Sequence, residues 1–488
     1  MSTIKKLAGQ TAIYGVSSII GRLLNYLLVP LHTHEEYGFG EADYGIISEF
    51  YAYVAFFIVL LTFGMETTFF RFVNKSVDKE KTFNQAASFV FILSILFFLT
   101  ILVFSQSIAN WMGYPEMKNF VVWFGAILAI DATTSMFLAK LRHQNRPVKF
   151  AVVQLSSIGV NILLNIIFIF GFYDNTHPDA SLGVGFIFLA NLIASFVKPL
   201  VLYKEVASYR FVWDKVMTKA MFIFALPLVI AGFAGIVNET LDRILIKRLL
   251  MGDGSEEQLE YAQAQVGIYS ANYKLSILIT LFIQAFRYAA EPFFFAQEKN
   301  EEKDKIYSRV MTYFIIVVSL MFLVIALNLD IFKWFIPNKD YHEGLKVVPI
   351  LLMANICLGI YYNQSIWYKL ADRTIYGAYI AIGGAVITIV LNIILIPIIG
   401  YMGSAWTTLA AYSSMMVASY FFGQKIYPIK YNLRKAALYI LSALSLYFVG
   451  TVISFDHLVY DTIYSLFLIL LFIGIAWFME RPKISFRK

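Results

Sequence analysis

Long apolar stretches separated by short polar loops follow one another along the whole chain. A helix needs about 20 apolar residues to cross the hydrocarbon core of a bilayer, and fourteen stretches are long enough. The segments near 345–368 and 402–424 are the most polar, so twelve or thirteen spans also fit the pattern. The fourteen stretches lie near residues 10–31, 46–70, 84–106, 119–139, 150–172, 182–203, 219–246, 266–290, 309–329, 345–368, 375–397, 402–424, 436–454 and 461–479.

This pattern predicts an all-α, polytopic membrane protein. The loops between the stretches are too short to hold a folded domain, so the function is expected within the membrane. Composition agrees, because 59% of the residues are hydrophobic and only 15% are charged. A soluble domain has about 25% charged residues. A chain this apolar would have too little polar surface to face water.

The net charge of +7 could indicate nucleic-acid binding, but the positions of the basic residues indicate a membrane topology. If the amino terminus is cytoplasmic and the sides alternate, 30 of the 39 Lys and Arg residues fall in inner segments and six in outer ones. Cytoplasmic loops carry such an excess. We therefore predict both termini in the cytoplasm of a bacterium, an inner-membrane location and no nucleic-acid partner. The first apolar segment is too long for a signal-peptide core, so we expect it to stay as the first span.

The two halves of the chain resemble each other. Residues 44–48 (Tyr-Gly-Ile-Ile-Ser) match 266–270 (Val-Gly-Ile-Tyr-Ser), and residues 163–167 match 390–394. Two halves of the same orientation predict parallel repeats, which occur in transporters that rock two bundles around a central site. We expect an N-terminal six-helix bundle at 1–205, its repeat at 206–430, and two additional helices with a basic tail at 431–488.

Polar and ionisable residues inside the predicted spans are candidates for function, because charge in a bilayer is costly. On the first span, a spacing of three or four residues puts the polar side chains on one face. These stripes predict a wet cavity. The candidates for substrate binding are Arg22, Arg243, Ser18, Asn25, Tyr273 and Gln284, and those for ion coupling are Asp131, Glu239 and Asp242.

Structural roles are the alternative for several of these residues. Glu239 and Arg243 are four residues apart and could neutralise each other, and Asp131 could join two helices. Arg22 has no acid within one helical turn. It could bind an anion, or it could pair with Asp131 or Glu239.

Known enzyme and cofactor motifs do not occur in the sequence. The single cysteine, Cys357, excludes a disulfide within the chain and a cysteine metal cluster. We find no phosphate-binding loop and no nucleophile constellation, so we expect no cofactor, no metal and no enzymatic activity. Transport would then depend on an ion gradient or on membrane potential.

The chain resembles the polysaccharide-export flippases of Wzx type, whose superfamily includes the lipid II flippase MurJ and the MATE exporters. The resemblance covers most of the chain. It rests on residues 5–15, which begin Lys-Lys and end Gly-Gln-Thr-Ala-Ile-Tyr-Gly, and on residues 21–31, Gly-Arg-Leu-Leu-Asn-Tyr-Leu-Leu-Val-Pro-Leu. Further matches are Glu-Ala-Asp-Tyr-Gly-Ile-Ile-Ser at 41–48 and Gly-Met-Glu-Thr-Thr-Phe-Phe-Arg-Phe at 64–72.

The resemblance implies a two-bundle fold, alternating access and an oligosaccharide substrate carried on a polyprenyl diphosphate. The lipid would move from the cytoplasmic to the periplasmic leaflet, for polysaccharide or lipopolysaccharide biosynthesis. It also implies that Arg22 and Arg243 meet the diphosphate, although Arg243 lies beside Glu239 and Asp242. We expect a monomer that contacts membrane lipids and works with glycan polymerases.

Two other functions stay open at this point. A MATE-like exporter of drugs or metabolites would need a cavity dominated by acids, since it binds cations. A membrane-embedded glycan polymerase or ligase would need a sizeable outer loop, and the predicted outer loops are short.

Overall fold

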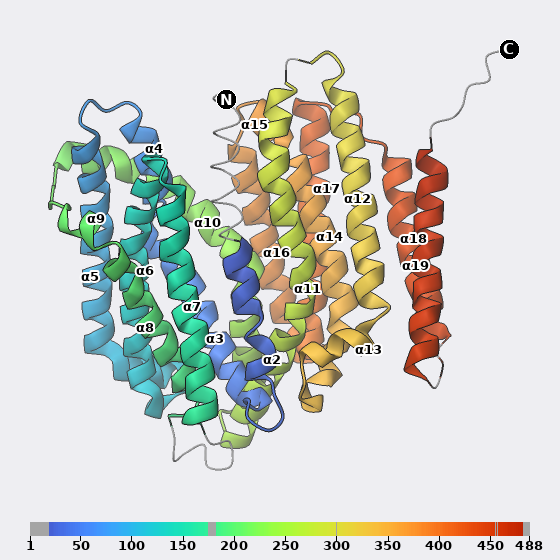
Figure 1. Cartoon of the computed structure of the whole chain (residues 1–488), viewed down its shortest axis with the longest axis horizontal. Helices are drawn as coiled ribbons and strands as arrows, with labels where there is room; N and C mark the ends of the chain where they lie inside the picture. The colour runs from blue at the N-terminus through green and yellow to red at the C-terminus, as the bar shows by residue number, and fades with distance from the viewer. Residues whose placement is uncertain (1–18, 174–181, 299, 454, 456, 482–488) are drawn as a thin grey trace. The chain divides into compact units, whose positions relative to one another are not determined.

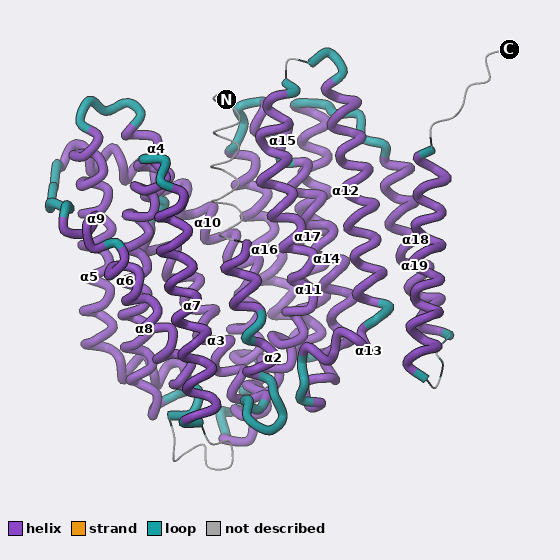
Figure 2. Tube along the Cα trace, in the orientation of Figure 1, coloured by secondary structure: helices purple, strands orange, loops and turns teal. Residues whose placement is uncertain are grey.

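The computed structural model describes residues 19–173, 182–298, 300–453, 455 and 457–481. In these ranges the secondary structure is helical and no strand occurs, as Figure 2 shows. The described residues form two compact units. Unit 1 comprises those of Met1–Ser270 with Asn392–Gly400, and unit 2 comprises Ala271–Leu391 with Tyr401–Lys488. The all-α prediction is confirmed.

The longer helices of unit 1 pack against one another in pairs. The main packing pairs are α5 with α6, α7 with α8, and α3 with α10 (Figure 1). The elements are α2 (Val29–His32), α3 (Glu41–Thr62), α4 (Met65–Val73), α5 (Lys79–Met112), the short 3-10 helix η1 (Pro115–Met117), α6 (Lys118–His143), α7 (Pro147–Gly171), α8 (Gly185–Val201), α9 (Tyr203–Ala207), α10 (Lys215–Leu250) and the first part of α11 (Glu256–Ala296).

Unit 2 contains the rest of α11 and the helices that follow it. Here α14 packs against α17, and α12 packs against α14 and α18. The elements are α12 (Lys303–Ala326), α13 (Leu329–Phe332), η3 (Lys333–Phe335), η4 (Lys339–Val347), α14 (Val348–Gln364), α15 (Ile366–Leu370), most of α16 (Ile375–Ile399), α17 (Tyr401–Ile426), α18 (Leu433–Val452) and α19 (Leu458–Glu480).

Among the described residues, 11 helical segments are long and apolar enough to cross a membrane. Two further apolar helices, Ile19–His32 and Gly185–Val201, are shorter. Every one of the fourteen predicted stretches contains helix in its described part. The protein is therefore a multi-pass membrane protein, and the count of fourteen spans stays a prediction.

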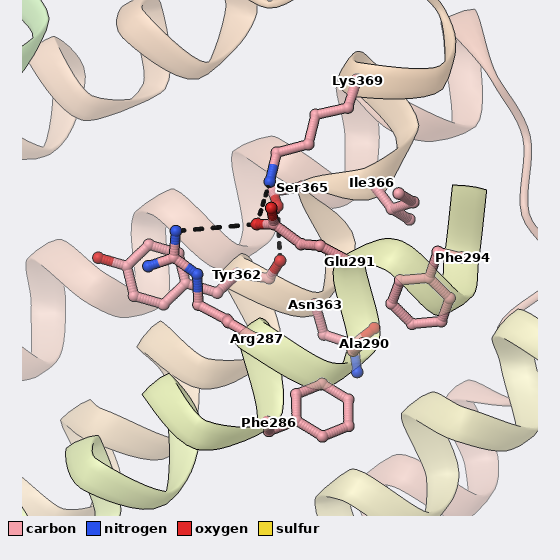
Figure 3. A pocket seen from close by; sticks show the side chains of 10 residues that line it. All are labelled: Phe286, Arg287, Ala290, Glu291, Phe294, Tyr362, Asn363, Ser365, Ile366 and Lys369. Carbon is pink, nitrogen blue, oxygen red and sulfur yellow. Dashed lines mark hydrogen bonds and ion pairs between the residues drawn. The ribbon is translucent and has the colours of Figure 1, made fainter. Parts of the chain in front are cut away.

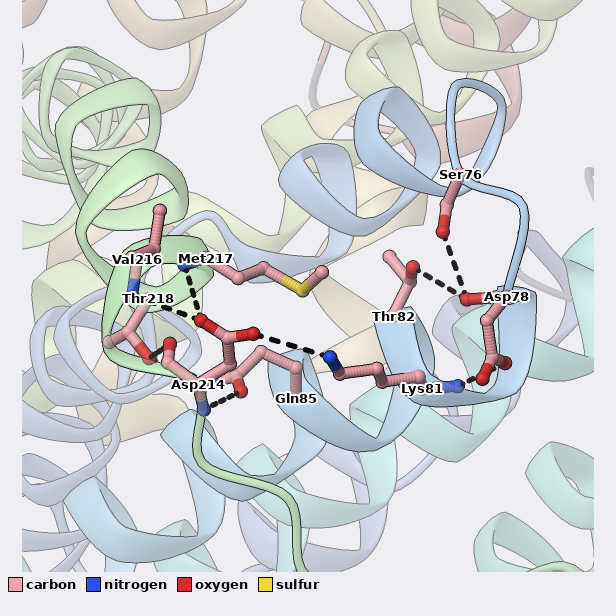
Figure 4. A network of polar contacts seen from close by, with 9 residues as sticks. All are labelled: Ser76, Asp78, Lys81, Thr82, Gln85, Asp214, Val216, Met217 and Thr218. Carbon is pink, nitrogen blue, oxygen red and sulfur yellow. Dashed lines mark hydrogen bonds and ion pairs between the residues drawn. The ribbon is translucent and has the colours of Figure 1, made fainter.

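Aspartates cap the starts of two helices in unit 1. The Asp78 carboxylate accepts a hydrogen bond from the Lys81 amide at the start of α5 (2.9 Å), and the Asp214 carboxylate accepts one from the Val216 amide at the start of α10 (3.0 Å). Such caps satisfy amides that have no partner in the first turn. Figure 4 shows that Lys81 also reaches Asp214, at 3.3 Å. The two helix starts are thereby tied together.

A break divides the second predicted span, 46–70, into α3 and α4. Phe63 has a φ of 48° and Gly64 a φ of 61°, so the backbone of both residues is in the left-handed region. Glycine adopts this conformation without steric cost, whereas a residue with a Cβ rarely does. The Thr68 hydroxyl donates to the Gly64 carbonyl at 2.9 Å and closes the new first turn. The sequence pattern predicted one continuous helix here and missed the break.

The matching glycines of the predicted repeat, Gly45 and Gly267, meet within unit 1. A Cβ on Gly45 would overlap the carbonyl oxygen of Gln263, and a Cβ on Gly267 would overlap that of Glu41. Each overlapped carbonyl lies four residues before the opposite glycine. The contact is therefore reciprocal, and only glycine allows two helix backbones to approach this closely.

Candidate functional site

Arg243 lies in a compact polar cluster on α10. Its guanidinium Nη1 donates to the Asp242 carboxylate and to the Glu239 carbonyl oxygen, both at 2.7 Å. Only 11% of its side chain is exposed. Tyr269, in the first half of α11, donates its hydroxyl to the other Asp242 oxygen at 2.6 Å. The predicted pairing of Arg243 with the Glu239 carboxylate is replaced by a pair with Asp242.

This cluster limits what Arg243 and Asp242 can do. Asp242 is 5% exposed and accepts hydrogen bonds on both carboxylate oxygens. An anion at Arg243 would have to compete with this carboxylate. Glu239 is exposed on the same helix. Of the three residues, Glu239 is thus the one whose side chain is open to solvent or lipid.

Arg22 and Asn25 lie on a helical segment, residues 19–26, and both are exposed. Ser18 lies outside the described residues. Within the described part of the chain, Arg22 forms no ion pair, whereas Asp131 and Asp242 each have a basic partner. The alternative in which Arg22 pairs with Asp131 is therefore absent from this structure. A guanidinium without a carboxylate is suited to bind an anionic group.

Asp131 joins two helices of unit 1. Its carboxylate accepts a hydrogen bond from the Lys198 ammonium of α8 at 2.7 Å, and both side chains are partly buried. This is the interhelical contact that the sequence left open as the structural alternative. Lys198 was expected in an inner segment and lies near the end of its helix.

Tyr273 and Gln284 belong to unit 2, on the second part of α11. Tyr273 is 8% exposed and its backbone carbonyl accepts a hydrogen bond from Ser276 at 2.7 Å. Gln284 is half-buried. Their proposed contact with substrate stays a prediction.

A buried ion pair that the sequence analysis missed lies in unit 1. Glu49 of α3 and Lys247 of α10 are both 0% exposed, and their side chains meet at 2.8 Å. Tyr114 donates its hydroxyl to the same carboxylate oxygen at 2.5 Å, and Lys247 donates to the Met112 carbonyl at 2.6 Å. The signal was present, because Glu49 is an acidic residue inside the second predicted span, but its partner is 198 residues away.

Resident metal or cofactor sites were not expected from the sequence. Among the described residues, no group of three or more His, Cys, Asp or Glu side chains is arranged to hold a metal ion. Among the candidate residues of unit 1, Asp131 and Asp242 are each paired with a basic residue, whereas Arg22 and Glu239 are exposed and form no ion pair within the described part of the chain.

Comparison with known proteins identifies the family. The profile of the family described as "Polysaccharide biosynthesis protein" matches residues 7–296, which is more than half of the chain. A protein of the Lsg locus of Haemophilus influenzae is 20% identical over 365 residues, covering 73% of this chain and 83% of that protein. An uncharacterized membrane protein of Methanocaldococcus jannaschii is 22% identical over 463 residues, covering 87% and 85%.

Solved structures show the same fold. The lipid II flippase MurJ in an inward closed conformation superposes with a TM-score of 0.72 at 13% identity, covering 95% of this chain and 98% of MurJ. An inward-facing MATE multidrug resistance transporter gives a TM-score of 0.62 at 14% identity, covering 88% and 95%. The resemblance found in the sequence is confirmed. The chain is a membrane transporter that belongs to the polysaccharide biosynthesis protein family, with the fold shared by MurJ and the MATE transporters.

Proposed function

We propose that the protein is a flippase for oligosaccharide carried on a polyprenyl diphosphate, which it moves from the cytoplasmic to the periplasmic leaflet of a bacterial inner membrane by alternating access. The observation that carries this proposal is the exposed guanidinium of Arg22 in an apolar helix, without a carboxylate partner among the described residues. The family match to polysaccharide biosynthesis proteins supports a glycan cargo.

The diphosphate is the part of such a lipid that cannot cross hydrocarbon unaided, because an isolated charge in an apolar medium is very costly. Arginine suits this group, since its planar fork of donors matches two phosphate oxygens at once. Arg22 would bind the diphosphate during the crossing. Asn25, one turn further along and also exposed, would add a neutral donor.

Arg243 would act as a second, weaker contact. Its guanidinium is shared with Asp242, so a diphosphate would meet both an attractive and a repulsive charge there. If the anion displaces Asp242 from the guanidinium, the carboxylate keeps the hydrogen bonds from the Tyr269 hydroxyl and from the backbone amide of Arg243. This competition would offer a way to release the substrate. Asp242 and Glu239 stay candidates for ion coupling.

The pairing of the acids favours this function over a cation exporter. Asp131 is neutralised by Lys198, and Asp242 by Arg243. An exporter of cationic drugs needs carboxylates that are available to the cation. Glu239 alone of the three candidate acids has an exposed side chain without a basic partner among the described residues.

The experiment is transport in proteoliposomes that contain the purified protein. A polyprenyl-diphosphate oligosaccharide with a fluorescent sugar is added, and quenching from outside reports its leaflet over time. Imposed proton, sodium and potential gradients identify the driving force. We expect flipping that depends on an imposed gradient. Export of a cationic dye without movement of the glycolipid would overturn the proposal in favour of the exporter.

A further inference from the structure

The segment that joins α8 to α10 carries exposed cations and exposed aromatic side chains close together in the chain. Segment 203–215 comprises α9, the non-helical stretch 208–214 and the first residue of α10, and it lies at the edge of unit 1 (Figure 1). Its exposed cations are Lys204, Arg210 and Lys215, and its exposed aromatic side chains are Tyr203, Phe211 and Trp213. Basic residues mixed with exposed aromatic residues are typical of protein surfaces that lie on a membrane.

The non-helical stretch is fixed to α5 through its backbone. The Val212 amide donates to the Ser88 hydroxyl at 3.0 Å, and the Asp214 amide donates to the Gln85 side-chain oxygen at 2.6 Å (Figure 4). Ser88 and Gln85 are both 0% exposed, so their polar groups need partners within the protein, and this backbone supplies them. Because the backbone is already held, little of its freedom is lost when the exposed side chains bind a partner.

The two acidic residues of the segment are already paired within unit 1. Glu205 is buried, and its carboxylate accepts a hydrogen bond from Nη1 of Arg146 at 2.9 Å and contacts the Lys149 ammonium. The Asp214 carboxylate accepts hydrogen bonds from backbone amides at the start of α10, and it lies 3.3 Å from the Lys81 ammonium. Neither acid is left to neutralise the cations of the segment.

The cations of the segment have no carboxylate partner. Within the described part of the chain, no ion pair involves Lys204, Arg210 or Lys215. Figure 3 shows the opposite case in unit 2, where the Lys369 ammonium contacts the Glu291 carboxylate. A soluble anion would satisfy the free cations but would leave the aromatic side chains in water. An anionic phospholipid offers partners to both, because its phosphate lies directly beside the apolar acyl region.

We propose that segment 203–215 lies on the cytoplasmic surface of the bilayer and binds the headgroups of anionic phospholipids. Its cations contact the phosphate groups, and Phe211 and Trp213 enter the boundary between headgroups and acyl chains. The segment follows one apolar helix, α8, and leads directly into another, α10, so the chain holds it at the membrane boundary. The pattern of basic residues assigns this boundary to the cytoplasmic side. The inference does not depend on which cargo the protein transports.

The test is quenching of Trp213 fluorescence by brominated lipids. The full chain is reconstituted in vesicles of four parts phosphatidylcholine to one part phosphatidylglycerol, with bromine either on all of the phosphatidylglycerol or on an equal amount of the phosphatidylcholine. The contribution of Trp213 is the quenching that is lost in a Trp213→Phe chain, in which phenylalanine can keep the stacking on Phe89. We expect bromine on phosphatidylglycerol to quench Trp213 about twofold or more beyond bromine on phosphatidylcholine, and high salt to reduce this ratio.

Two matched triple variants separate these cations from the charge of the whole protein. Replacing Lys204, Arg210 and Lys215 by glutamine should bring the quenching ratio to about one, because the attraction for the anionic headgroup is lost. Replacing three exposed cations of another predicted cytoplasmic loop, Lys425, Lys430 and Arg434, by glutamine changes the net charge equally and should leave the ratio as in the wild type. Both variants are compared at equal thermal stability.

Three results would overturn the proposal. Equal quenching by the two lipids in the wild type would show a segment without preference for anionic headgroups. No quenching of Trp213 by either lipid would show that the segment faces water, as a docking site for another protein would. A stable triple variant at 204, 210 and 215 that keeps the wild-type ratio would show that these cations do not bind the headgroups. Because the readout is contact with lipid, failure of flipping would leave the result unaffected.

Discussion

The buried pair of Glu49 and Lys247 makes the sharpest prediction about stability. Substituting Lys247→Met removes one partner and leaves a carboxylate that is 0% exposed. The Glu49 carboxylate then keeps the hydrogen bond from the Tyr114 hydroxyl at 2.5 Å, and the Met112 carbonyl at the end of α5 loses its donor. Breaking a buried ion pair from one side costs about 3–5 kcal/mol. Glu49→Leu should cost a similar amount, because Lys247 is then buried without a counter-ion.

The double variant distinguishes a buried pair from two independent side chains. With Lys247→Met and Glu49→Leu together, no charge is left buried, and an apolar pair of similar volume is often close to neutral. We expect the double variant to cost about 1–2 kcal/mol, the effect of the unsatisfied Tyr114 hydroxyl and Met112 carbonyl. The cost should thus be smaller than for either single variant.

The assay is equilibrium unfolding in mixed detergent micelles, followed by tryptophan fluorescence. Lys305→Met serves as the control, because Lys305 pairs with Glu302 on the surface and its loss should leave the unfolding curve unchanged. Single variants within 1 kcal/mol of the wild type, or a double variant equal to the sum of the singles, would refute the reasoning.

Three further predictions concern backbone packing, an ion pair and the membrane topology. Gly45→Ala should destabilise the protein by about 1–3 kcal/mol, because the new methyl group overlaps the backbone of Gln263. Gly159→Ala, in open space on α7, should instead stabilise the protein by about 0.5–1 kcal/mol. Equal shifts of the two melting temperatures would contradict this. Burial raises the pKa of Glu205, but the hydrogen bond from Lys149 and the charges of Lys149 and Arg146 outweigh it and hold this pKa below its usual range. Glu205→Gln should therefore cost about 1 kcal/mol at pH 7, and the difference should vanish as the pH falls through the lowered pKa; a difference that persists below pH 3 would count against the pair. A single cysteine at position 300 should react with an impermeant maleimide from the cytoplasmic side alone, and labelling from outside would overturn the topology.

The periodicity of apolar residues was sufficient to predict the helices, because lipid-facing segments must be apolar for their whole length. It could not predict the break at Phe63 and Gly64. The left-handed backbone conformation of Phe63 depends on its surroundings in the fold, and the hydropathy of the residue does not indicate it. The predicted repeat rests in part on two short glycine motifs, and the structure adds why glycine is needed at both places.

Charge pairing was predictable only where the partners are close in sequence. The acidic neighbours of Arg243 already indicated that its guanidinium is shared, and Asp242 is adjacent to it. Asp131 and Lys198 are 67 residues apart, and Lys369 and Glu291 are 78 apart, so only the packing of helices brings them together. The binding roles of Ser18, Arg22, Asn25, Tyr273 and Gln284 stay predictions.

The flipping rate of Arg22 variants tests the central claim most directly. Arg22→Lys keeps the charge but loses the fork of donors, and Arg22→Ala loses both. Arg434→Ala, at an exposed arginine on α18, is the matched control. With each protein reconstituted at equal amount and equal thermal stability, the account predicts strong loss of polyprenyl-diphosphate oligosaccharide flipping in both Arg22 variants and a wild-type rate in the control. A stable Arg22→Ala protein that flips the glycolipid at the wild-type rate would contradict it.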